Sequence, residues 1–149
     1  DVMESAPTAE ETISEPSEYE VMRTNAIAKK NRATQTRLEK VLSYTKQTMV
    51  AYMSEEDLNR LCTYVAEYST EDTLQKISPV KVDSQLKSID IMHFGWNIGK
   101  AFGRKRIHTA TFIKNVFAHT LCDVEISTIE RKMSHTESKT KIHLNNQLV

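Results

Sequence analysis

The sequence predicts a mainly α-helical bundle that carries a helix-turn-helix near its C-terminal end. Apolar residues recur at helical spacing over several long stretches, and only three Gly and three Pro occur in 149 residues. A β-sandwich or barrel needs many more turns than these residues supply. Residues 109–134 add the pattern of a helix, a short turn and a second helix. At this length we expect one domain with its own core, and no apolar run approaches the length of a membrane span.

The N-terminal third divides into an acidic tail and a long helical region. Residues 1–17 contain two of the three prolines and lack periodic apolar residues, so we expect a flexible acidic tail. Residues 18–50 contain few helix breakers and a patchy apolar stripe. This pattern predicts one long helix, or two helices joined near Asn31. The helical domain proper is therefore expected to span residues 18–149.

Two helices and a connector are predicted in the middle of the chain. Residues 54–68 place apolar side chains at the i, i+3, i+4, i+7 spacing behind a candidate N-cap serine. A short helical turn is expected at 71–77, followed by a connector. Residues 88–102 resume the apolar pattern, and Gly95 and Gly99 lie four apart within them. We expect a neighbouring helix to approach closely there.

The C-terminal third contains the helix-turn-helix pattern itself. Thr109 is the expected cap of a helix that runs to about Phe117, and residues 119–124 can supply the turn. Residues 125–134 form the second helix. Residues 139–144 alternate between polar and apolar side chains, which suits a short strand or a wing-like β-ribbon.

A net charge of zero conceals strong segregation of charge along the chain. Residues 1–20 hold seven acids and no base, whereas residues 21–49 hold seven bases and one acid. Residues 50–99 hold eight acids and four bases, and residues 100–149 hold nine bases and four acids, a local charge of +5. A basic block suits a polyanionic partner, because the partner senses the local field. For the helix at 21–49 two interpretations remain, a solvated face or a face that contacts DNA.

The second helix of the motif has the composition of a helix that reads DNA. Ile129 and Met133 lie four apart and can face the core, whereas Arg131 and Lys132 lie off that side. Phosphate binding needs clustered cations, and base reading needs side chains on an exposed helix face. The alternative is a core helix pair with ordinary solvated charges. The predicted DNA-binding residues are Arg104, Lys105 and Arg106 for flanking phosphates, Ser127, Thr128, Arg131 and Lys132 on the reading helix, and Lys139 and Lys141 on the wing.

Metal binding and catalysis are less well supported by the pattern. His119 and Cys122 form one close pair, with His135 and His143 far downstream, whereas zinc sites combine closely spaced pairs. No nucleophile elbow, phosphate loop or HExxH spacing occurs. We therefore expect no metal, no cofactor and no catalytic residue. Two cysteines and the absence of a secretory signal suit a cytoplasmic protein with reduced thiols.

Three segments carry a resemblance to a known group of proteins. They are HFGWNIGK at 93–100, TFIKNVF at 111–117 and STIERKM at 127–133. Together they resemble accessory and regulatory proteins of Bacteroides-type conjugative transposons, including the regulator of tetracycline-element excision. The resemblance covers roughly residues 50–148 and implies a C-terminal helix-turn-helix or winged module that acts on DNA. It also implies control of transcription, excision or mobilisation.

The sequence as a whole favours a non-enzymatic DNA-binding protein that acts in transcriptional regulation or in excision or mobilisation of a mobile element. A homodimer or a protein partner is compatible with this function. The rival hypothesis is a helical adaptor that uses its Phe- and Trp-rich helices to bind a protein partner or itself. A third and weaker option is a small hydrolase or toxin-like enzyme.

Overall fold

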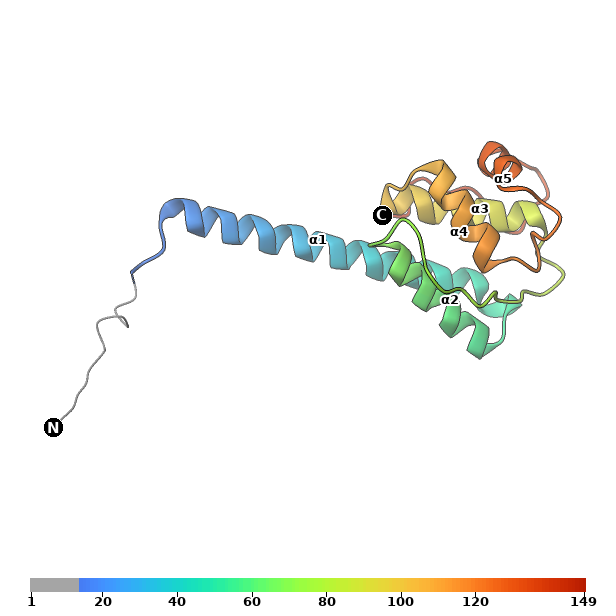
Figure 1. Ribbon diagram of the computed structural model, residues 1–149, viewed down its shortest axis with the longest axis horizontal. Coiled ribbons are helices and arrows are strands. Elements are labelled where there is room, and N and C mark those ends of the chain that lie inside the picture. Colours follow the sequence, from blue (N-terminus) through green and yellow to red (C-terminus); the bar gives the residue numbers. More distant parts are fainter. Residues whose placement is uncertain (1–13) are drawn as a thin grey trace. The chain divides into compact units, whose positions relative to one another are not determined.

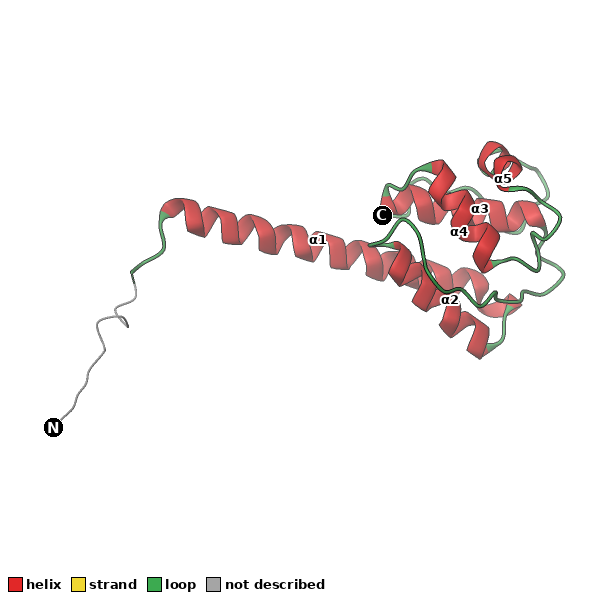
Figure 2. Cartoon of the chain, viewed as in Figure 1, coloured by secondary structure: helices red, strands yellow, loops and turns green. Residues whose placement is uncertain are grey.

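All regular structure in the described part of the chain, residues 14–149, is helical. The computed structural model contains five α-helices and one 3₁₀ helix in these residues and no strand (Figures 1 and 2). The predicted mainly α class is therefore confirmed. Most of the predicted acidic tail lies outside the described residues, and residues 14–17 precede the first helix without regular structure.

The predicted helices match the observed ones, except that the helical turn expected at 71–77 is absent and the fourth helix begins earlier than expected. Over residues 14–149, none of the helices combines the length and the apolar character that a membrane crossing requires. The elements are α1 (Glu18–Met49), η2 (Val50–Tyr52), α2 (Glu55–Tyr68), α3 (Ser88–Phe102), α4 (Arg106–Val116) and α5 (Ile126–Lys132).

Helix α1 begins with a capping box. Ser17 Oγ accepts a hydrogen bond from Glu20 N, and Glu20 Oε1 accepts one from Ser17 N, both at 3.1 Å. This exchange satisfies two backbone donors that would otherwise lack partners at the helix start. The helix then continues through Asn31 without a break, so one long helix forms rather than two.

The chain divides into two units, Asp1–Thr34 and Gln35–Val149. In the described part of the first unit every side chain is exposed except half-buried Ala28. In the second unit the last turns of α1 bury Val41, Thr45 and Met49. The hydrophobic core belongs entirely to this second unit.

Helix α3 is the centre of the core, and its two glycines allow α4 to pack closely against it. A Cβ atom at Gly95 would lie 2.6 Å from Ile113 Cγ2, and one at Gly99 would overlap the hydroxyl of Thr109. Such distances leave no room for a side chain. The predicted close approach at Gly95 and Gly99 is confirmed.

Thr109 is not the cap of α4, contrary to the prediction. The helix begins three residues earlier, at Arg106, so Thr109 lies in its first turns and is buried. Its Oγ1 shares a 2.8 Å hydrogen bond with the hydroxyl of Tyr68. The Tyr68 ring in turn stacks on Phe112 with 4.3 Å between ring centroids. These contacts join α2 to α4.

The C-terminal segment after α5 is irregular, and the predicted β-ribbon at 139–144 does not form. Side chains on one side of α3 instead form hydrogen bonds with the backbone groups of this C-terminal segment. Asp90 Oδ1 accepts hydrogen bonds from Lys141 N at 2.7 Å and Ile142 N at 3.1 Å. His93 contacts the carbonyl oxygens of Ile142 and His135 at 2.8 and 2.6 Å. Because these backbone groups already bond to side chains of α3, they are not available for the hydrogen bonds of a strand ladder.

Asn97 continues the same row of polar side chains one turn further along α3. Its Nδ2 donates to His143 O at 2.9 Å and its Oδ1 accepts from Asn145 N at 2.6 Å. Its Nδ2 also donates to the hydroxyl of Tyr44 at 2.7 Å. The segment is thus held at three successive points along α3.

The predicted helical turn at 71–77 is wrong, because these residues follow an irregular path. Side chains of α2 hold the chain that leaves this stretch. Arg60 donates to Ser78 O at 3.0 Å and to Pro79 O at 2.8 Å. A stretch of seven residues is also too short to be helical without packing support.

Alkaline pH is expected to weaken the fold through Tyr68. Burial raises the pKa of this phenol from 10 to about 12, although the Thr109 hydrogen bond and the Arg104 charge oppose the rise. The folded state therefore favours the protonated phenol. Stability from this group is complete below pH 10 and is lost as pH rises toward 12, by about 1.4 kcal/mol at pH 11. Urea unfolding at pH 8 and pH 11 measures the loss, and Tyr68→Phe should be less sensitive to pH than the parent. Equal sensitivity in the two proteins would contradict this expectation.

Candidate nucleic-acid interface

Helices α3, α4 and α5 pack against one another in every pairing, which makes a three-helix unit at the C-terminal end of the fold (Figure 1). The turn between α4 and α5 runs through residues 117–125 and is longer than predicted. It contains no glycine. Something else must therefore fix its path.

Lys114 fixes the path of this turn. Its ammonium group donates hydrogen bonds to three carbonyl oxygens of the turn, Leu121 O at 2.6 Å, Val124 O at 2.7 Å and Cys122 O at 3.3 Å. An ammonium group has three donors, so all of them are used. The side chain thereby sets where α5 begins. Nothing in the sequence indicates this role, because Lys114 resembles any other helix lysine.

Helix α5 presents one side to the core and another to solvent. Ile129 and Met133 are buried, as predicted from their spacing. Ser127, Arg131 and Lys132 are exposed, and Thr128 is half-buried. In residues 14–149 no hydrogen bond or ion pair engages the side chains of Arg131 and Lys132. Both cations are therefore available to a partner.

Of the three cations at 104–106, one has no hydrogen-bond partner within residues 14–149, and the other two already contact other parts of the fold. Lys105 is exposed at the N-cap position of α4. Arg104 forms an ion pair with Asp72, donates to Tyr68 O at 3.1 Å and lies over the Tyr68 ring at 5.6 Å. The Arg104 guanidinium is thus a structural contact between α2 and the start of α4.

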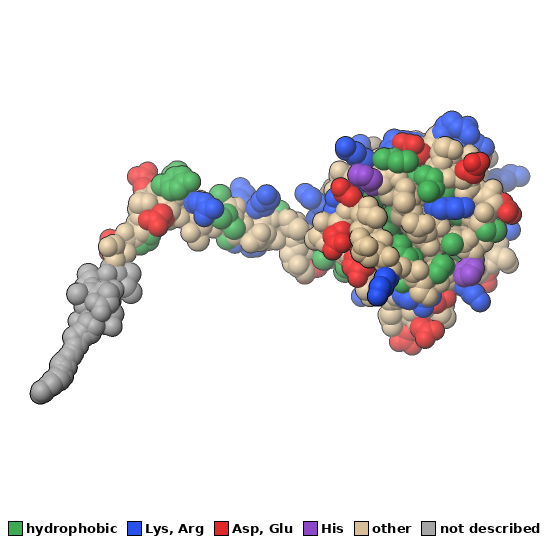
Figure 3. Space-filling view, viewed as in Figure 1, with side chains coloured by type: hydrophobic (Ala, Val, Ile, Leu, Met, Phe, Trp, Pro, Cys, Tyr) green, Lys and Arg blue, Asp and Glu red, His purple; other side chains and the backbone are tan. Residues whose placement is uncertain are grey.

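Arg106 links the start of α4 to the end of α5. Its guanidinium donates to Ser134 Oγ at 3.0 Å and to the carbonyl oxygen of Glu130. This pairing brings the basic run and α5 to the same edge of the unit. Figure 3 shows basic side chains along the edge where α5 lies in Figure 1, with acidic side chains between them.

The two lysines assigned to a wing are placed differently from that expectation. Lys139 and Lys141 are exposed, but they lie in the irregular segment that Asp90 holds through the Lys141 backbone. No β-ribbon carries these two lysines.

The described residues contain no group of three or more His, Cys, Asp or Glu side chains that could hold a metal ion. The close pair from the sequence, His119 and Cys122, lies exposed in the α4–α5 turn. Cys62 is half-buried on α2, and burial raises the pKa of its thiol against the opposing charge of Lys46. A raised thiol pKa reduces the reactive thiolate.

A search for similar proteins found no matching family model, no matching curated protein and no matching solved structure.

Proposed function

We propose that the chain is a non-enzymatic protein that binds duplex DNA through the exposed side of α5. The observation that carries the proposal is the division of this helix, with Ile129 and Met133 in the core and Arg131 and Lys132 in solvent without partners in residues 14–149. Lys105 adds a further exposed cation close in sequence to Arg106, which bonds to the end of α5. Clustered cations of this kind are what phosphate binding requires.

The arrangement of α3, α4 and α5 supports the interpretation of this three-helix unit as a helix-turn-helix. In that motif a second helix presents side chains to the major groove while its other side packs on the preceding helices. Helix α5 packs on both α3 and α4. The long α4–α5 turn and the two-turn length of α5 differ from the usual form of the motif. Transcriptional regulation, excision or mobilisation of a mobile element is the role that the resemblance to transposon regulators suggests.

Replacing Arg131 and Lys132 with Gln tests the proposal. The double variant should bind a mixed-sequence duplex about tenfold or more weakly than the parent, because each cation is expected to contact a phosphate. The slope of log affinity against log salt should also become shallower by about 2, at about 0.9 per lost phosphate contact. Its stability should change by less than about 0.5 kcal/mol, as surface substitutions usually do. Fluorescence anisotropy across a salt series and urea unfolding measure the two effects.

Lys76 and Lys81 supply a matched control. Both are exposed and lie outside the three-helix unit, so Lys76→Gln with Lys81→Gln removes the same charge elsewhere. This control should keep the affinity and salt slope of the parent. If both double variants weaken binding equally, α5 is not the DNA-binding surface. If the parent fails to bind duplex at low salt, the function itself is wrong.

A second candidate function, protein interaction, rests on the first unit of the chain. Four large apolar side chains there are well exposed on α1: Tyr19, Val21, Met22 and Ile27, with exposed fractions of 67, 43, 58 and 44%. Exposed apolar side chains this close in sequence are typical of a surface that binds another protein. Sedimentation of the parent and of a variant with Tyr19, Met22 and Ile27 replaced by Ser tests self-association. An unchanged monomer in both would remove the homodimer form of this candidate.

A further inference from the structure

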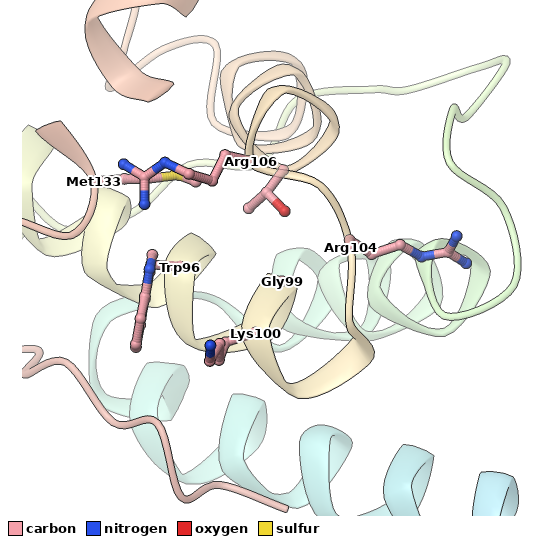
Figure 4. Close-up of a pocket in the computed structure, with 7 residues that line it drawn as sticks. Trp96, Gly99, Lys100, Arg104, Arg106 and Met133 are labelled. Atoms are coloured by element: carbon pink, nitrogen blue, oxygen red, sulfur yellow. The ribbon is translucent and has the colours of Figure 1, made fainter. Parts of the chain in front are cut away.

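A basic cavity lies where α3, the start of α4 and the end of α5 meet. Its volume is about 200 Å³, and its lining includes Trp96, Lys100, Arg104, Arg106 and Met133. Three of these five side chains are cationic, and none of the lining residues, all within the described part of the chain, is acidic. Figure 4 shows Trp96 and Lys100 on α3, and Arg106 extending from the start of α4 toward Met133. Cations gathered without acids around a cavity suit an anionic ligand.

Two of the three cations can serve such a ligand. The Arg104 guanidinium points away from the cavity in Figure 4, toward its ion pair with Asp72. Arg106 remains in the cavity, and its two hydrogen bonds to Ser134 and Glu130 leave three of its five N–H donors for a ligand. Lys100 is exposed at the rim, and its ammonium group has no hydrogen-bond partner among residues 14–149. A guanidinium and an ammonium group that line the same cavity can both bind a phosphoryl group.

Trp96 adds a flat aromatic surface beside these cations. It is the only tryptophan of the chain and is half-buried. An aromatic ring at the edge of a cationic site can stack on a planar group, and a nucleic-acid base is such a group. The cavity, at about 200 Å³, also has more space than a bare phosphate needs. A phosphoryl group with its adjoining sugar fits this space better.

We propose that this cavity binds a nucleoside phosphate, with the phosphoryl group between Lys100 and Arg106 and the base against Trp96. The ligand is either a free mononucleotide or a nucleotide of bound nucleic acid, and only the second source rests on the proposed function. In both cases the ligand contacts Arg106, which also bonds to Glu130 at the end of α5. Occupancy of the cavity is therefore coupled to the position of α5.

The lone tryptophan makes the test direct in the full-length chain. Adenosine monophosphate should quench Trp96 fluorescence to saturation, and adenosine and inorganic phosphate should each bind at least fivefold more weakly, because each offers only half of the contacts. Lys100→Gln should weaken binding of adenosine monophosphate at least fivefold. Lys76→Gln is the matched control, because Lys76 is an exposed lysine outside the three-helix unit that does not line the cavity. It should bind like the parent.

A second titration distinguishes the two sources. If adenosine monophosphate gives no saturable change but a 5′-phosphorylated single-stranded oligonucleotide quenches Trp96 in a Lys100-dependent manner, the ligand is a nucleotide of nucleic acid. The proposal is overturned if neither probe binds, if inorganic phosphate binds as tightly as adenosine monophosphate, or if Lys76→Gln loses as much affinity as Lys100→Gln. Duplex binding by the Arg131→Gln, Lys132→Gln variant is measured in parallel, so that failure at α5 is separated from failure at the cavity.

Discussion

Asp90→Ala is expected to lower the free energy of unfolding by about 3–5 kcal/mol and to release the C-terminal segment from α3. The Asp90 side chain is only 2% exposed. Its Oδ1 accepts from the backbone of Lys141 and Ile142, and its Oδ2 accepts from Lys87 N at 2.9 Å. Removing the carboxylate leaves three backbone donors without this partner, of which Ile142 N is buried and the other two are partly buried. An unsatisfied buried donor costs about 1–3 kcal/mol.

Urea unfolding measures the loss of stability, and hydrogen exchange measures protection of residues 135–145. Asp90→Asn should fall between the parent and Asp90→Ala, because its carbonyl oxygen can keep the two bonds to Lys141 and Ile142. Asp83→Ala is the control, since the exposed Asp83 also accepts a backbone hydrogen bond, from Gln85 N at 2.8 Å. A loss no larger in Asp90→Ala than in Asp83→Ala would show that the segment does not depend on this carboxylate.

Local pattern was sufficient to predict α2 and α3, but it predicted a helical turn at 71–77 that does not form and a start of α4 three residues too late. The apolar spacing at 54–68 and 88–102 gave α2 and α3 to within a residue, and the glycines of α3 indicated the close contact with α4. Each of these patterns lies within one or two helical turns, so it can be recognised without knowledge of the fold. The same reasoning placed Ile129 and Met133 in the core.

Contacts between distant residues could not be predicted in this way. Asp90 and Ile142 are 52 residues apart, and nothing in the alternating pattern at 139–144 distinguishes a strand from a segment that α3 holds. Contacts between distant residues also limited what could be predicted of the candidate site. Arg104 and Lys105 are equivalent in sequence, yet the distant residues Tyr68 and Asp72 make Arg104 a structural contact while Lys105 remains exposed.

Gly99→Ala is expected to destabilise the fold by about 2–3 kcal/mol, toward the upper end of the usual overpacking range. The added Cβ would overlap Thr109 Oγ1 and lie 2.9 Å from Thr109 Cγ2 and 3.1 Å from its Cβ. Thr109 cannot rotate away freely, because its hydroxyl is bonded to Tyr68. Alanine also favours the helix by about 1 kcal/mol over glycine. The measured loss of stability is therefore the cost of the clash minus this gain in helix propensity.

Gly95→Ala and a double variant separate this clash from a general intolerance of α3 to substitution. At Gly95 the added Cβ meets Ile113 Cγ2 and Cδ1, and Cδ1 is the end of a flexible side chain, so the loss should be smaller than at Gly99. Thr109→Ala removes the obstructing hydroxyl and methyl groups. Thr109→Ala combined with Gly99→Ala should therefore be more stable than the sum of the two single losses, by about 1 kcal/mol or more. Strict additivity would mean that Gly99 is required for its backbone freedom and not for the approach of α4. The α3–α4 contact would then have to tolerate a methyl group that the observed geometry excludes.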